Sequence, residues 1–192
     1  MITTQLKEGT FEYHEQLEQK LKSSLFKEEL SPLEYLNLIK KFNIAYQTLE
    51  KAIGYIPYTN SLLKTRTKLP MLQNDIQYLE DLVGEKLLYD KETISIEPIN
   101  NLAKALGIMY VMEGATLGGN VILKILKQHS WVETEKGLNF FNSYGEERGK
   151  MWKDFIQIID THINLNPHDS EELIEGAKMA FIFIDKILSN KN

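Results

Sequence analysis

The chain has 192 residues, of which 43% are hydrophobic and 26% are charged, and its formal net charge is −5. It contains no cysteine, which excludes disulfides and thiolate chemistry and leaves His, Asp and Glu to bind any metal. The acidic balance and the lack of a basic block argue against a nucleic-acid binder.

Helical periodicity dominates the sequence, so we expect an all-α protein with a single domain over residues 1–192. The predicted helices span residues 3–24, 31–53, 61–64, 70–83, 99–129, 146–162 and 170–188. Segment 93–98 alternates like a strand, but a lone strand has no partner. The N-terminal stretch lacks the order of a signal peptide, so we expect a soluble, cytoplasmic protein without a membrane span.

The first helix carries the most informative histidine. His14 lies on the same face as Leu17 and Leu21, and Glu18 follows one turn later. We expect the imidazole to point into the interior, with Glu18 accepting the N–H of one ring nitrogen, as in many metal-ligating histidines. On the residues alone, a core histidine held by local hydrogen bonds is the more common outcome. A carboxylate-bridged metal site is disfavoured, because no second helix supplies a matching Glu-x-x-His.

Residues 110–126 have the periodicity of a buried helix, yet they include Gly114, Gly118 and Gly119. Each glycine costs about 1 kcal/mol relative to alanine in a helix interior. We expect the helix to bend there and its backbone to approach another group closely. That group is either a neighbouring helix or a flat ligand such as haem, whose iron needs only one histidine from the protein.

Several stretches resemble the haem oxygenase family, and most closely its bacterial branch. The proximal-helix pattern of that family is similar to LKEGTFEYHEQLE, and its distal-helix pattern to YVMEGATLGG. Further likeness is found in KLPMLQNDIQYL, GLNFFNSYGEERGKMWKDF and EGAKMAFIFIDKIL. The resemblance covers nearly the whole chain in order. It implies a single-domain helical bundle that holds haem between a proximal helix and a kinked distal helix.

The resemblance also implies roles for individual residues. His14 becomes the axial iron ligand, and Gly114 and Gly118 become the catalytic glycines over the haem. The expected haem-binding residues are Lys7, Thr10, Glu18, Leu117, Gly119, Phe141, Lys153 and Phe181. Lys7 and Lys153 match positions that face haem propionates, and Glu18 orients the axial ligand. The chain departs from animal members in having Gln157, Met109 and Ala115 where those have an arginine, an aromatic residue and a distal aspartate.

The implied activity is cleavage of haem, which is both cofactor and substrate, to biliverdin, carbon monoxide and ferrous iron with O2. Electrons must come from outside, because no flavin or nicotinamide fingerprint is present. The resemblance implies a ferredoxin, a flavodoxin or a flavin reductase, docked near Lys7 and Lys153. Two alternatives stay open: a non-catalytic haem carrier, buffer or sensor on the same fold, and a relative of the thiaminase-like or di-iron branches of this architecture.

Overall fold

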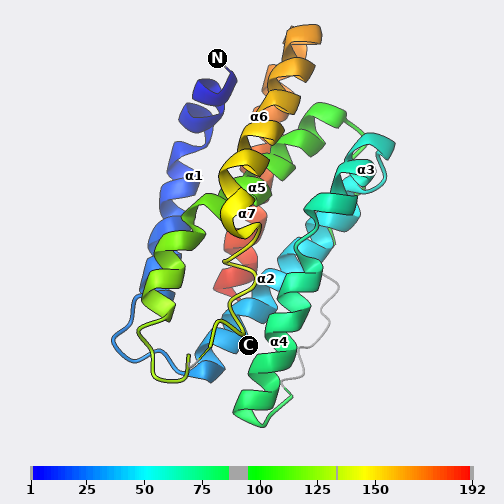
Figure 1. Ribbon diagram of the computed structural model, residues 1–192. Coiled ribbons are helices and arrows are strands. Elements are labelled where there is room, and N and C mark those ends of the chain that lie inside the picture. Colours follow the sequence, from blue (N-terminus) through cyan, green and yellow to red (C-terminus); the bar gives the residue numbers. More distant parts are fainter. Residues whose placement is uncertain (1, 87–94, 133, 191–192) are drawn as a thin grey trace.

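The computed structural model describes residues 2–86, 95–132 and 134–190. In these residues the chain forms α-helices and two short 3₁₀ helices, without a strand. The elements are α1 Ile2–Leu25, α2 Pro32–Ile53, α3 Pro57–Arg66, α4 Leu69–Val83, α5 Leu102–Leu126, η1 Gly145–Glu147, α6 Arg148–Leu165, η2 Pro167–Asp169 and α7 Ser170–Ser189. The predicted all-α helical bundle is therefore confirmed (Figure 1).

The start of α2 follows from its sequence. Ser31 Oγ accepts a hydrogen bond from the Glu34 N–H at 3.2 Å, and the Glu34 carboxylate accepts one from the Ser31 N–H at 2.9 Å. This reciprocal pair is a capping box, and Pro32 fits the first helical position. Hydrogen bonds from the Lys27 ammonium and from Ser31 lower the pKa of Glu34 to about 2.

Other helix ends differ from the predictions. α3 is longer than the predicted 61–64, because Pro57 already starts it. α5 is shorter than the predicted 99–129 and begins where the Asn101 side chain accepts from the Lys104 N–H at 2.9 Å. Asp169 precedes α7 but does not cap it, because its carboxylate contacts His162 Nε2 at 2.8 Å. Residues 95–98 form no strand, and residues 93–94 lie outside the described residues.

The helices α5 and α7 form the most extensive helix pair of the bundle, and α1 and α2 also pack on α7 (Figure 1). Two glycines let the backbones of α5 and α7 meet. A Cβ on Gly107 would lie 1.9 Å from the Leu173 carbonyl oxygen, and a Cβ on Gly176 would lie 2.0 Å from the Lys104 carbonyl oxygen. No side chain fits at either position, so this crossing fixes the N-terminal half of α5.

The two halves of α5 have different surroundings. Residues 105–113 are all buried, whereas Ala115, Leu117 and Gly118 are exposed on one side. Figure 1 shows the α5 ribbon bending along its length, as the glycines predict. Among the described residues, only α5 is long and apolar enough to cross a membrane, but 61% of its most apolar window is buried inside the bundle. Such burial is typical of the core helix of a soluble protein.

Candidate functional site

A cavity of about 600 Å³ lies between α1 and the second half of α5, with further walls from α2, α6 and α7. Its walls are mainly apolar. Several of the protein's exposed large hydrophobic side chains belong to it, namely Phe11, Phe26, Leu117 and Val121. A concave, mostly apolar cavity with a few polar groups is typical of a small-molecule or cofactor site.

His14 contributes the imidazole of this cavity. The predicted burial of this ring is wrong: its side chain is 59% exposed, because it points into a cavity that is open to solvent. The ring packs edge-on against Phe181, with the centroids 5.8 Å apart. His14 Nδ1 lies 3.8 Å from Glu18 Oε2, which is longer than a hydrogen bond. The imidazole is thus held from one side and accessible from the other.

The carboxylates of the cavity all come from α1. Glu18 Oε1 lies 2.7 Å from Lys22 Nζ, and the hydrogen bond from Lys22 lowers the pKa of Glu18. Glu15 brings the number of potential metal ligands here to three, with ligand atoms within 4.8 Å of one another. In the described part of the chain, no other helix adds an acid to the cavity lining. This arrangement does not match a carboxylate-bridged metal centre, which needs ligands from several helices.

The three glycines in the second half of α5, Gly114, Gly118 and Gly119, serve two different purposes. A Cβ on Gly118 would meet no atom within 4 Å, and a Cβ on Gly114 would meet only the Trp152 indole, at 3.6 Å. Both glycines line the cavity. A Cβ on Gly119 would lie 2.1 Å from the Phe141 carbonyl oxygen, so this glycine permits close packing within the protein. Of these three glycines, Gly114 and Gly118 lack a protein neighbour that forbids a side chain.

The aromatic wall at Phe140 and Phe141 depends on a buried acid of α4. Asp75 accepts hydrogen bonds from the Asn139 N–H at 2.9 Å, the Asn139 side-chain amide at 2.6 Å and the Phe140 N–H at 2.8 Å. Burial raises the pKa of Asp75, although these hydrogen bonds oppose the shift. This role of Asp75 was not predicted from the sequence. The sequence feature that could have identified Asp75 is its position as an acidic residue on the apolar face of an amphipathic helix.

A sequence model of the family described as Heme oxygenase matches residues 1–190. The chain belongs to the haem oxygenase family. Its fold is similar to that of the haem oxygenase from Neisseria meningitidis, with a TM-score of 0.72 and 24% identity over 98% of this chain and 90% of that chain. It is also similar to the haem oxygenase from Leptospira interrogans, with a TM-score of 0.73 and 17% identity over 98% of each chain. A search of curated proteins finds no match.

Most of the residues singled out by the haem oxygenase resemblance meet in the cavity. The lining includes Lys7, Thr10, His14, Glu18, Gly114, Leu117, Gly118, Phe141 and Phe181. Gly119 and Lys153 are not part of it, and Lys153 is exposed on α6 just beyond Trp152. The Thr10 hydroxyl donates to the Leu6 carbonyl at 2.7 Å. Lys22 is a second cation of the lining, which the sequence analysis did not predict.

A charged cluster adjoins the cavity in this haem oxygenase family member, because its Glu113 directly precedes the cavity residue Gly114. It consists of Arg66, Lys68, Glu113 and Tyr144, which come from three separate stretches of the chain. Burial lowers the pKa of Lys68, and the neighbouring Glu113 carboxylate opposes that shift. Glu113 stands in the family-like motif YVMEGATLGG, but its pairing with the other three depends on tertiary structure.

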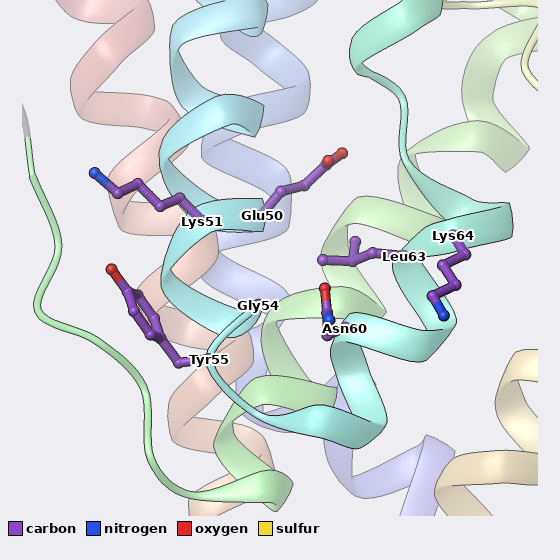
Figure 2. Close-up of a pocket in the computed structure, with 7 residues that line it drawn as sticks. All are labelled: Glu50, Lys51, Gly54, Tyr55, Asn60, Leu63 and Lys64. Carbon is purple, nitrogen blue, oxygen red and sulfur yellow. The ribbon is translucent and has the colours of Figure 1, made fainter.

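A second hollow of about 480 Å³ lies between the end of α2 and α3 (Figure 2). Figure 2 shows the charged ends of Lys51 and Lys64 pointing in different directions. The Glu50 carboxylate is already used: it accepts from the Thr67 hydroxyl at 2.6 Å and from the Lys68 N–H at 3.0 Å. The polar groups of this hollow do not converge, so it is a weaker candidate site than the cavity.

Proposed function

We propose that this chain is a haem oxygenase that cleaves haem to biliverdin, carbon monoxide and ferrous iron, using O2 and external electrons. One observation carries the proposal: His14 and the glycines Gly114 and Gly118 line the same apolar cavity, and no protein neighbour excludes a side chain at either glycine. Because glycine weakens a helix, its presence at two unobstructed positions that line a cavity supports a space reserved for a ligand.

The cavity residues suit haem as that ligand. The apolar walls match the faces of a porphyrin, Lys7 suits its carboxylates, and imidazole is a common axial ligand of haem iron. His14 is expected to bind iron through Nε2, because Nδ1 is the nitrogen near Glu18. A rotation of the Glu18 side chain would let it accept the Nδ1 N–H, and Lys22 holds the Glu18 carboxylate on this side of the ring.

The α5 wall determines what can lie beside the iron. Haem, when bound, supplies the iron that activates O2 and the ring carbon that is oxidised. Gly118 leaves space for O2 because it has no side chain. Ala115 offers no acid, so protons must arrive through water. The Thr116 hydroxyl donates to the Glu113 carbonyl at 2.7 Å, which leaves its oxygen free to accept a hydrogen bond from such a water. Asn120 is less suited, since its side-chain oxygen accepts from Arg148.

The proposal includes an external electron donor and a cytoplasmic location. The donor is a ferredoxin, a flavodoxin or a flavin reductase, because the chain has no flavin or nicotinamide motif of its own. Lys7 lines the cavity and is exposed, which supports docking of an acidic donor on that side. Lys153 is also exposed, but it lies away from the cavity lining.

The test is a spectroscopic titration followed by turnover. Purified protein is mixed with hemin and then given ascorbate or a ferredoxin system in the presence of catalase. We expect a Soret band that decays into the broad red absorption of biliverdin. His14→Ala is expected to abolish turnover, whereas His168→Ala, at an 82% exposed side chain outside the cavity lining, leaves it unchanged. A Soret band that never decays refutes the enzyme and favours a haem carrier, buffer or sensor. The absence of any band refutes haem binding.

A further inference from the structure

Glu113 is the last residue of the buried half of α5, directly before the cavity glycines. Its carboxylate is held by three donors: Arg66 Nη1 at 2.5 Å, Lys68 Nζ at 2.8 Å and the Tyr144 hydroxyl at 2.8 Å. The side chains of Arg66, Lys68 and Glu113 are 6%, 1% and 2% exposed. Ion pairs this deeply buried lose much of their attraction to desolvation, so they are weak evidence for stability. Their geometry indicates a role in fixing positions.

Arg66 connects two walls of the cavity without lining it. Its Nη1 also donates to the Met151 carbonyl of α6 at 3.1 Å. Met151 directly precedes Trp152, and Glu113 directly precedes Gly114. The Trp152 indole is the neighbour that a Cβ on Gly114 would meet, at 3.6 Å. The Arg66 guanidinium therefore binds the residues that directly precede Gly114 and Trp152, and these two cavity residues face each other.

Tyr144 gives an independent indication that the cluster is held in one arrangement. Its φ of 66° places it in the left-handed region, and no other non-glycine residue among those described has a positive φ. This conformation is costly for a residue with a Cβ, and glycine would adopt it more easily. The Tyr144 ring centroid lies 4.2 Å from Lys68 Nζ, and its hydroxyl reaches Glu113. The strained backbone of Tyr144 thus occurs at the residue whose side chain contacts both Glu113 and Lys68.

We propose that Arg66 and Glu113 are a positioning pair for the cavity. They fix Gly114 and the Trp152 indole relative to each other, and so they set the shape of the cavity on the α5 side of bound haem. The effect on haem rests on the proposed function, whereas the placement of Trp152 does not. Neither Arg66 nor Glu113 lines the cavity, so both act through their chain neighbours.

The first experiment uses haem-free protein and the emission of Trp152, in a Trp131→Phe background that removes the other tryptophan. Arg66→Met is expected to shift the emission to longer wavelength, because the indole loses its fixed position and gains water. The matched control is Lys40→Met, which breaks another buried ion pair, with Glu80 at 2.5 Å, outside the cavity lining. An unchanged emission in folded Arg66→Met overturns the proposal, as does an equal shift in the control.

The second experiment uses the ferrous carbon monoxide complex of the haem-loaded protein. Arg66→Met is expected to shift and broaden the C–O stretching band and to lower turnover by about 10- to 100-fold. Arg66→Lys restores part of the band, and Lys40→Met leaves it at the wild-type position. A wild-type band in Arg66→Met contradicts the proposal.

A further variant covers the case in which Arg66→Met fails to fold. Tyr144→Phe removes the hydrogen bond that Tyr144 donates to Glu113 and the one that it accepts from Lys68, but it unpairs no charge, so it is expected to shift both signals to a smaller extent. Unchanged signals in Tyr144→Phe then overturn the proposal. If the wild-type protein binds no haem, the proposed function fails, while the Trp152 emission still decides whether Arg66 and Glu113 position the cavity.

Discussion

Alanine is expected to have opposite effects on stability at two adjacent residues of α5. At Gly118 the added methyl group meets no atom within 4 Å, so helix propensity decides, and the free energy of unfolding rises by about 1 kcal/mol. At Gly119 the methyl group would lie 2.1 Å from the Phe141 carbonyl oxygen, so α5 or the Phe141 backbone must move. Overpacking of this kind costs about 1–3 kcal/mol.

Thermal unfolding of the haem-free variants, followed by far-UV circular dichroism, measures this difference. For a chain of this length, 1 kcal/mol corresponds to about 2–4 °C in Tm, so Gly118→Ala raises Tm by roughly that amount and Gly119→Ala lowers it. Gly118→Leu is expected to keep the helical spectrum while it fills the cavity and abolishes turnover. Equal destabilisation of the haem-free protein by Gly118→Ala and Gly119→Ala would show instead that Gly118 serves protein packing and leaves no space for a ligand.

Three further predictions test the site and its supports. His14→Ala leaves the free energy of unfolding within about 0.5 kcal/mol in thermal melts, because the side chain is largely exposed; a larger loss would show that the imidazole supports the fold. Glu34→Gln lowers this free energy by about 0.5 kcal/mol at pH 7, since the capping box is exposed. The native pKa of Glu34 is about 2, below its ordinary value of 4.5, so the contribution of Glu34 to the free energy of unfolding is lost as pH falls from 4.5 to 2. The urea melts of Glu34→Gln and of the wild type are therefore expected to converge as the pH approaches 2. Asp75→Ala leaves two backbone N–H groups unpaired and costs about 2 kcal/mol or more in urea melts, whereas Asp81→Ala, at an exposed position of α4, has little effect.

The sequence was sufficient for the helical bundle and for several helix ends. Periodicity located the long helices, and the serine and proline at Ser31 and Pro32 marked the start of α2. The start of α3 was missed because a short helix has too few turns to show a period. Asp169 stands at the N-cap position of α7, but its carboxylate contacts His162 and makes no capping hydrogen bond, which local pattern does not reveal.

The site was predictable in part. Helix energetics identified three unusual glycines, but only the packed structure separates Gly118, which faces open space, from Gly119, which meets Phe141. The positioning pair was not predictable, since Arg66 and Glu113 are 47 residues apart and a charged residue in an apolar run does not reveal its partner. Both the difference between Gly118 and Gly119 and the pairing of Arg66 with Glu113 depend on contacts between segments far apart in the sequence, which a local sequence pattern does not encode.

The exposed apolar side chains that line the cavity are expected to affect the abundance of the protein in a cell. Phe11 and Val121 are 62% and 58% exposed, so a chain without ligand presents these groups to water and to other proteins. Any ligand that fills the cavity covers them and stabilises the fold by mass action. We therefore expect the abundance of the protein to follow haem supply: chains that bind haem persist, while those that do not are degraded or aggregate first.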